Sequence, residues 1–103
     1  MNFTKKKYLV SLNSEKEVSI VNFYVNWSFY SRIQKLILGK FHKCTCNKVK
    51  IYNVNSDSNK ELVDQFQVRS FPSILIFKNG DMVEHLSGLQ DNETLLKVLR
   101  KIL

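Results

Sequence analysis

The chain has 103 residues, of which 44% are hydrophobic and 12% aromatic, and it carries a formal net charge of +7. This length and composition predict a single packed domain over residues 1–103 and exclude an intrinsically disordered chain. No segment contains the roughly 18 continuous apolar residues that span a membrane, and the apolar run near the N-terminus is too short for a secretory signal, so we expect a cytoplasmic protein or a mature form without its leader.

The basic charge balance favours either a well-solvated surface or an acidic partner that is approached by electrostatic steering. The lysines are dispersed along the chain, and no motif of a known RNA- or DNA-binding class accompanies them. Nucleic-acid binding is therefore not expected.

Hydrophobic periodicity predicts an alternation of strands and helices. The nearly continuous apolar run at residues 18–25 is typical of a central strand covered on both faces. Asn79 and Gly80 predict a hairpin turn because both tolerate a positive φ, and Asp91 or Asn92 is expected to cap the last helix. The expected strands are residues 1–3, 18–25, 48–54, 73–78 and 82–86, and the expected helices are residues 4–12, 31–41, 60–66 and the C-terminal segment. The helix at 31–41 carries apolar residues at helical spacing, namely Ile33, Leu36, Ile37 and Phe41.

The expected strand at residues 18–25 is followed by W-S-F-Y-S at residues 27–31. A strand, a tryptophan, two small polar residues three positions apart and then a helix resemble the active-site segment of the thioredoxin family, in which W-C-x-x-C carries the redox cysteines. Here Ser28 and Ser31 stand at the two cysteine positions. Thiol–disulfide exchange needs a thiolate to attack and a second sulfur to resolve the mixed disulfide, so we expect this chemistry to be absent from the usual site.

The resemblance extends over nearly the whole chain. Residues 68–73, V-R-S-F-P-S, are similar to the family segment V-R-S-I-P-T, whose proline is cis, and Pro72 is the only proline in the chain. Residues 74–81, I-L-I-F-K-N-G-D, resemble the family sequence L-L-L-F-K-N-G-E, and Gly88 lies where thioredoxins keep a glycine. The resemblance implies a thioredoxin fold, which is an α/β fold with a central mixed β-sheet flanked by helices on both faces.

Two further positions depart from the family pattern. Thioredoxins usually have a buried aspartate, which acts in proton transfer, where this chain has Asn22, and the lysine often found near that aspartate aligns with Asn53. An amide cannot ionise and so cannot act as a general base. Because both members of the buried ion pair are replaced by neutral groups, neither is left as an unpaired charge. We interpret this as natural loss of redox function. The alternative is an active protein disulfide reductase in which Ser28 and Ser31 are engineered Cys-to-Ser changes.

The two cysteines, Cys44 and Cys46, follow the second expected helix. They are expected to be reduced loop thiols, although a disulfide between them would close a strained, readily reduced ring and could act as a substitute redox centre. With His42 they offer three zinc ligands where a structural site needs four, so no metal or other cofactor is expected. The implied fold holds His42 and His85 away from the start of the helix, which excludes a serine hydrolase. The hydroxyls of Ser28 and Ser31 are expected instead to cap free N–H groups at the helix N-terminus.

In the thioredoxin family, extended peptide segments bind along the cis-proline loop. Aromatic side chains at positions 29 and 30 would enlarge the apolar surface beside that loop, unless they pack on neighbouring loops instead. We therefore expect a module that binds a protein or an extended peptide in the former substrate groove. The expected groove residues are Trp27, Phe29, Tyr30, Phe71 and Pro72.

Overall fold

A computed structural model of the protein describes residues 18–44 and 49–102. The strand, helix and loop that we expect within residues 1–17 lie outside the described residues. None of the described helices is long and apolar enough to cross a membrane. The described elements are β1 (Val18–Tyr24), α2 (Phe29–Cys44), β2 (Val49–Asn55), α3 (Lys60–Gln65), β3 (Ser73–Lys78), β4 (Asp81–Ser87) and α4 (Asn92–Ile102).

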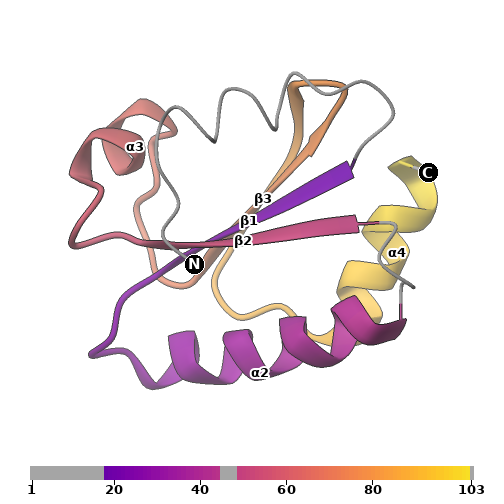
Figure 1. Ribbon diagram of the computed structural model, residues 1–103, viewed down its shortest axis with the longest axis horizontal. Coiled ribbons are helices and arrows are strands. Elements are labelled where there is room, and N and C mark those ends of the chain that lie inside the picture. The colour runs from indigo at the N-terminus through magenta and orange to yellow at the C-terminus, as the bar shows by residue number, and fades with distance from the viewer. Residues whose placement is uncertain (1–17, 45–48, 103) are drawn as a thin grey trace.

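The described strands form one sheet in the order β2-β1-β3-β4. β1 runs parallel to β2 and antiparallel to β3, and β4 runs antiparallel to β3, so the sheet is mixed. α2 and α4 pack on one face, and α3 packs on the other (Figure 1). The expected α/β architecture, a mixed sheet with helices on both faces, is confirmed.

Both faces of β1 are covered, which explains its nearly continuous apolar sequence. Successive side chains of a strand point to opposite faces of the sheet. Val18 and Ile20 belong to the core cluster under α2 and α4, whereas Val21 and Phe23 belong to the cluster under α3. All four side chains are buried. Burial of each contributes about 1.5–3 kcal/mol to folding. β1 thus contributes to both halves of the core, as β3 does through Leu75 and Ile76.

The last helix presents one apolar stripe to the sheet, as its periodicity predicts. Leu95 and Leu99 are buried in the cluster that α4 shares with α2, and Val98 and Ile102 pack against the same cluster. The hairpin is also confirmed, because Asn79 and Gly80 have φ angles of 55° and 84°.

The second helix is longer than its sequence pattern predicts. It begins at Phe29 instead of Ser31, and it ends at Cys44 instead of near Phe41. The Ser28 hydroxyl accepts a hydrogen bond from the backbone N–H of Ser31 at 3.3 Å, which makes Ser28 the N-cap of the helix. Ser28, whose hydroxyl was expected to cap this helix, therefore determines where the helix begins.

The helix-capping side chain at the start of α4 is Asp91. Its carboxylate accepts a hydrogen bond from the backbone N–H of Thr94 at 2.8 Å, which decides between the two predicted caps. That backbone hydrogen bond, followed by one from the Thr94 side chain, lowers the pKa of Asp91 below its ordinary value of 3.8. The ionised carboxylate thus stabilises the N-terminus of α4.

The change Asp91→Ala is expected to lower the melting temperature at neutral pH, because the cap of α4 is lost. A carboxylate whose pKa is lowered by folding stabilises the protein above its unfolded pKa, and this contribution disappears as the pH falls through the folded pKa. The difference in urea midpoint between the parent protein and Asp91→Ala should therefore shrink at pH values below 3.8.

Asp91→Asn is the matched control, since it keeps an acceptor oxygen at the cap without the charge. It should retain most of the stability at neutral pH and show no loss that tracks this titration. An Asp91→Ala deficit that is the same at all pH values would contradict a role for the ionised cap.

Candidate functional site

The register of the sheet brings residues 27–31 and the loop containing Pro72 to the same end of the sheet. Phe23, near the end of β1, pairs with Ser73, the first residue of β3. The chain leaves β1 toward Trp27 at the end of the sheet where the loop containing Pro72 enters β3. The Phe71–Pro72 peptide bond is cis, as the family resemblance implies.

The cis-proline loop is anchored to the segment that follows β4. The backbone N–H of Gly88 donates to the carbonyl of Pro72 at 2.9 Å. Gly88 has a φ of 83°, a conformation that residues with a Cβ rarely adopt. Pro72 is buried, and the half-buried Phe71 packs against the core cluster under α3. The side chains of Phe71 and Pro72, both expected in the groove, therefore add little exposed apolar surface.

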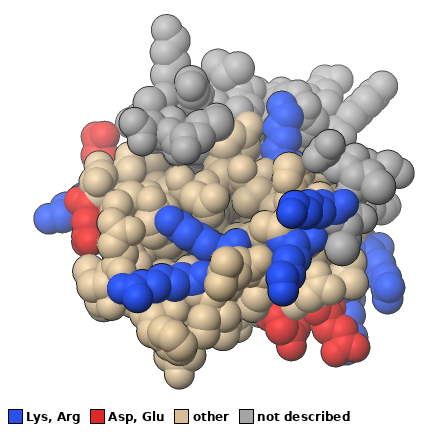
Figure 2. All heavy atoms as spheres, turned by 60° about the horizontal axis from the view of Figure 1, so that its bottom comes forward, with Lys and Arg blue, Asp and Glu red and all other residues tan. Residues whose placement is uncertain are grey.

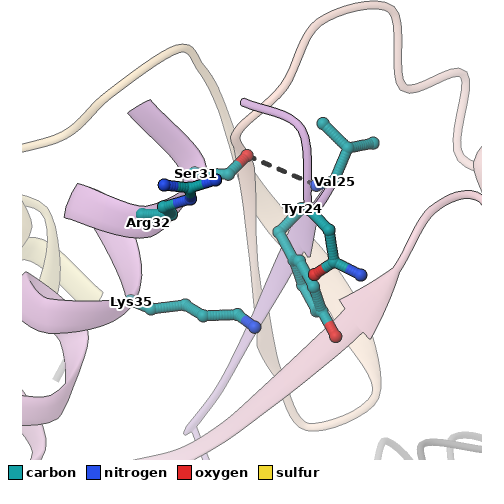
Figure 3. A pocket seen from close by; sticks show the side chains of 6 residues that line it. Tyr24, Val25, Ser31, Arg32 and Lys35 are labelled. Carbon is teal, nitrogen blue, oxygen red and sulfur yellow. Dashed lines mark hydrogen bonds between the residues drawn. The ribbon is translucent and has the colours of Figure 1, made fainter. Parts of the chain in front are cut away.

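Ser28 and Ser31, which the sequence resemblance aligns with two cysteines, are both engaged in local hydrogen bonds. Ser28 caps α2, as described above. The buried Ser31 hydroxyl accepts from the backbone N–H of Val25 at 3.3 Å, so it ties the helix to the end of β1 (Figure 3). Ser31 is thus not a helix cap. His42 and His85 lie in the last turn of α2 and on β4, so the described residues offer neither serine a histidine base.

Asn22 and Asn53 form a neutral pair across two parallel strands. They are register partners in β1 and β2, and the Asn22 side-chain amide donates to the Asn53 carbonyl oxygen at 3.1 Å. Asn22 is fully buried, whereas Asn53, which was expected to be buried with it, is exposed. Within the described part of the chain, the side-chain carbonyl oxygen of Asn22 accepts no hydrogen bond. An unsatisfied buried acceptor costs about 1–3 kcal/mol. The pair joins the strands but holds no titratable proton.

The aromatic side chains at the start of α2 are open to solvent. Trp27 is 73% exposed, Phe29 67% and Tyr30 59%. The rings of Phe29 and Tyr30 contact each other, with centroids 6.0 Å apart, and neighbouring loops do not cover them. Exposed apolar side chains that gather in one place often mark an interaction site. Of the five expected groove residues, these three supply the accessible apolar surface.

The inner face of α2 differs from the predicted one. Leu36 was grouped with the apolar residues of the helix, but it is 70% exposed, whereas Gln34 is fully buried. The Gln34 amide donates to the Gln90 carbonyl at 3.0 Å and accepts from the Gln90 N–H at 2.7 Å. These two hydrogen bonds compensate for burial of a polar group. They place Gln34 toward the loop before α4 and leave Leu36 in the exposed surface beside the aromatic residues.

Cys44 lies far from this site. Cys44 is the last residue of α2, and a helix rises about 1.5 Å per residue, which puts its backbone roughly 20 Å from that of Ser31. Cys46 lies outside the described residues. Whether Cys44 and Cys46 are reduced loop thiols or the alternative redox centre therefore stays a prediction, as does the expectation that they bind no zinc with His42.

The thioredoxin family model matches residues 1–101. The chain belongs to the thioredoxin family. The thioredoxin of Alicyclobacillus acidocaldarius is 30% identical over 103 residues, which cover 100% of this chain and 97% of that protein. The thioredoxin of Rickettsia typhi is 33% identical over 82 residues, covering 80% of this chain and 78% of that protein.

Solved structures confirm the thioredoxin fold. A structure described as thioredoxin-2, a component of malaria parasite protein secretion machinery, matches with a TM-score of 0.81 and 24% identity over 86% of each chain. A second structure, described as a malarial protein, matches with a TM-score of 0.78 and 24% identity, covering 82% of this chain and 96% of that one. At these identities the likeness concerns the fold alone.

Exchanging the polarity of two neighbouring positions tests the orientation of α2. Gln34→Leu should lower the free energy of unfolding by about 1–3 kcal/mol, because both backbone groups of Gln90 lose their partner. Leu36→Gln should change it by less than about 0.5 kcal/mol, because the side chain is exposed. Urea unfolding of both variants measures these differences. A larger loss from Leu36→Gln than from Gln34→Leu would show that the helix is rotated from the orientation described.

Proposed function

We propose that this thioredoxin-family protein binds a protein or an extended peptide and does not perform dithiol–disulfide exchange at the usual site. The observation that carries the proposal is the combination of two hydrogen-bonded serines, Ser28 and Ser31, with three exposed aromatic side chains in the same segment. The chemical groups for redox work are missing there, while the surface for contact is present.

The first part of the proposal concerns the lost chemistry. We infer that Ser28 and Ser31 replace the family's redox cysteines. A hydroxyl oxygen neither forms nor breaks a disulfide, and both hydroxyls already accept backbone hydrogen bonds. Asn22, at the position of the family's aspartate, has no proton to exchange at ordinary pH. The absence of both sulfur and a buried acid supports a role without electron transfer.

The second part concerns the surface that remains. Four of the seven exposed large hydrophobic side chains among the described residues lie within residues 27–36. Aromatic side chains are enriched among the residues that contribute most to binding at protein interfaces. The backbone of the cis-proline loop lies at the same end of the sheet as residues 27–31. Family members bind extended peptides along this loop. The former substrate surface therefore supports docking of a peptide segment.

The competing function is that of a thiol–disulfide oxidoreductase represented by a Cys-to-Ser variant. Family membership and the relatives named thioredoxin favour it. The neutral Asn22–Asn53 pair speaks against it, because a variant designed only to remove the two thiols has no reason to carry amides there.

An insulin-reduction assay on the product of the native gene separates these two functions. We expect no activity from the parent protein and measurable activity from Ser28→Cys/Ser31→Cys. Adding Asn22→Asp to the double variant should increase the rate further, since it restores the acid of the family pattern. Insulin reduction by the native-gene product, or thiols at positions 28 and 31 in its mass spectrum, would refute the proposed loss of chemistry.

Removal of the exposed aromatic side chains tests the binding role. Trp27→Ala/Phe29→Ala/Tyr30→Ala should abolish capture of peptides selected from a random display library, because the apolar contact surface is lost. Its far-ultraviolet circular dichroism spectrum should match that of the parent, since the three side chains are exposed.

Met82→Ala/Val83→Ala is the matched control, because it removes two other exposed hydrophobic side chains, on β4. This variant should capture the selected peptides as the parent does. Equal capture by the aromatic triple variant and the parent would refute binding at the start of α2.

A further inference from the structure

The positive charge of this protein is concentrated in one part of the chain. Between Glu17 and Asp57 there is no acidic residue, and six Lys or Arg residues contribute +6 of the formal net charge of +7. Four of these six residues lie in α2, which contains no aspartate or glutamate. The lysines themselves are dispersed along the chain. The charge is concentrated because no acidic residue lies among these six cations.

The outer face of α2 combines these cations with apolar side chains. Exposed residues recur along the helix at spacings of three or four, which places them in one stripe. Figure 2 shows Lys and Arg side chains converging over the face on which α2 lies, with Asp and Glu at its margins. From the start of the helix to its end, the exposed stripe consists of Phe29, Arg32, Leu36, Lys40 and Lys43.

A pocket opens beside the first turns of this stripe. It has a volume of about 70 Å³ and is lined by residues from the end of β1 and from α2, including Tyr24, Ser31, Arg32 and Lys35. Lys35 extends from α2 toward Tyr24 at the end of β1 (Figure 3), and Arg32 lines the same pocket. The Lys35 Nζ lies 3.4 Å from the centroid of the Tyr24 ring, a cation–π contact that orients the ammonium group. Two cations and no carboxylate line this pocket, which suits an anionic group.

We propose that the partner of this protein is an acidic protein segment with apolar residues among its acidic ones, bound along the outer face of α2. This inference rests on the proposed binding function and names the partner's chemistry. The apolar residues of the segment contact the aromatic side chains and Leu36. One of its carboxylates enters the pocket between Arg32 and Lys35.

The composition of the stripe favours a protein segment over a nucleic acid. Single-stranded nucleic acids are bound by cations together with aromatic rings on which successive bases stack. Here the exposed aromatic rings lie only at the start of α2, and the next apolar residue along the stripe is the aliphatic Leu36, which is 70% exposed. A leucine between cations complements an apolar side chain between carboxylates. The surrounding positive charge excludes basic competitors and steers acidic ones.

Peptide selection followed by charge reversal tests this inference. A random-peptide display library is selected on the whole protein, and the dissociation constants of selected peptides are measured by fluorescence polarisation. The selected sequences should be enriched in Asp and Glu next to apolar residues. Arg32→Glu/Lys35→Glu should weaken binding about tenfold or more, since attraction becomes repulsion. Arg32→Gln/Lys35→Gln should weaken it less, and added salt should reduce the affinity of the parent.

Lys60→Glu/Lys101→Glu is the matched control, because it changes the net charge equally at exposed sites at the start of α3 and in the last turn of α4. It should alter the dissociation constant less than about twofold if binding depends on the α2 face and not on total charge. Circular dichroism spectra of all variants establish that they are folded.

The outcomes separate this inference from the function on which it rests. Selected peptides that lack acidic enrichment, or that bind Arg32→Glu/Lys35→Glu as tightly as the parent, would overturn the acidic partner while leaving peptide binding in place. Failure to select any peptide would overturn both. An oligothymidylate that binds the parent tightly at physiological salt, and loses binding on the same reversal while the peptides do not, would assign the basic face to nucleic acid instead.

Discussion

The pairing between β1 and β3 is the constraint on which the site depends. Because Phe23 lies opposite Ser73, the segment that leaves β1 and the cis-proline loop that enters β3 lie at the same end of the sheet. The Ser31 hydroxyl then ties α2 to Val25, and Gly88 holds the carbonyl of Pro72. A shift of one residue in this register would turn the side chains of β1 to the wrong faces and move the two segments apart.

The polar side chains near this end of the sheet form hydrogen bonds that connect its helix and strands. Ser28 and Ser31 form the hydrogen bonds that start α2 and join it to β1. Asn22 and Asn53 join β1 to β2 by an amide hydrogen bond. At the positions that we infer to correspond, the family pattern carries sulfur and an ionisable acid. The same backbone framework thus accommodates groups that hold the loop in place, which is all that the proposed binding function requires of them.

Much of this structure could be predicted from local signals. The two-sided burial of β1, the Asn79–Gly80 turn and the cap of α4 each follow from the residues themselves, and the family motifs located the segment at residues 27–31. The orientation of α2 could not be predicted in this way, because Gln34 is buried by two hydrogen bonds to Gln90, which is 56 residues away in the chain. Hydrophobicity alone assigns the inner position to Leu36, and only the tertiary partner of Gln34 reverses that assignment.

The run of sequence without acidic residues also has a kinetic consequence. With +6 in that run and nearly balanced charges elsewhere, the molecule has an electric dipole. An approaching body of opposite charge exerts a torque on such a dipole and turns α2 toward itself within about 8 Å, the screening distance at physiological ionic strength. The protein is then oriented before contact, so a larger fraction of encounters involves α2 rather than the other faces.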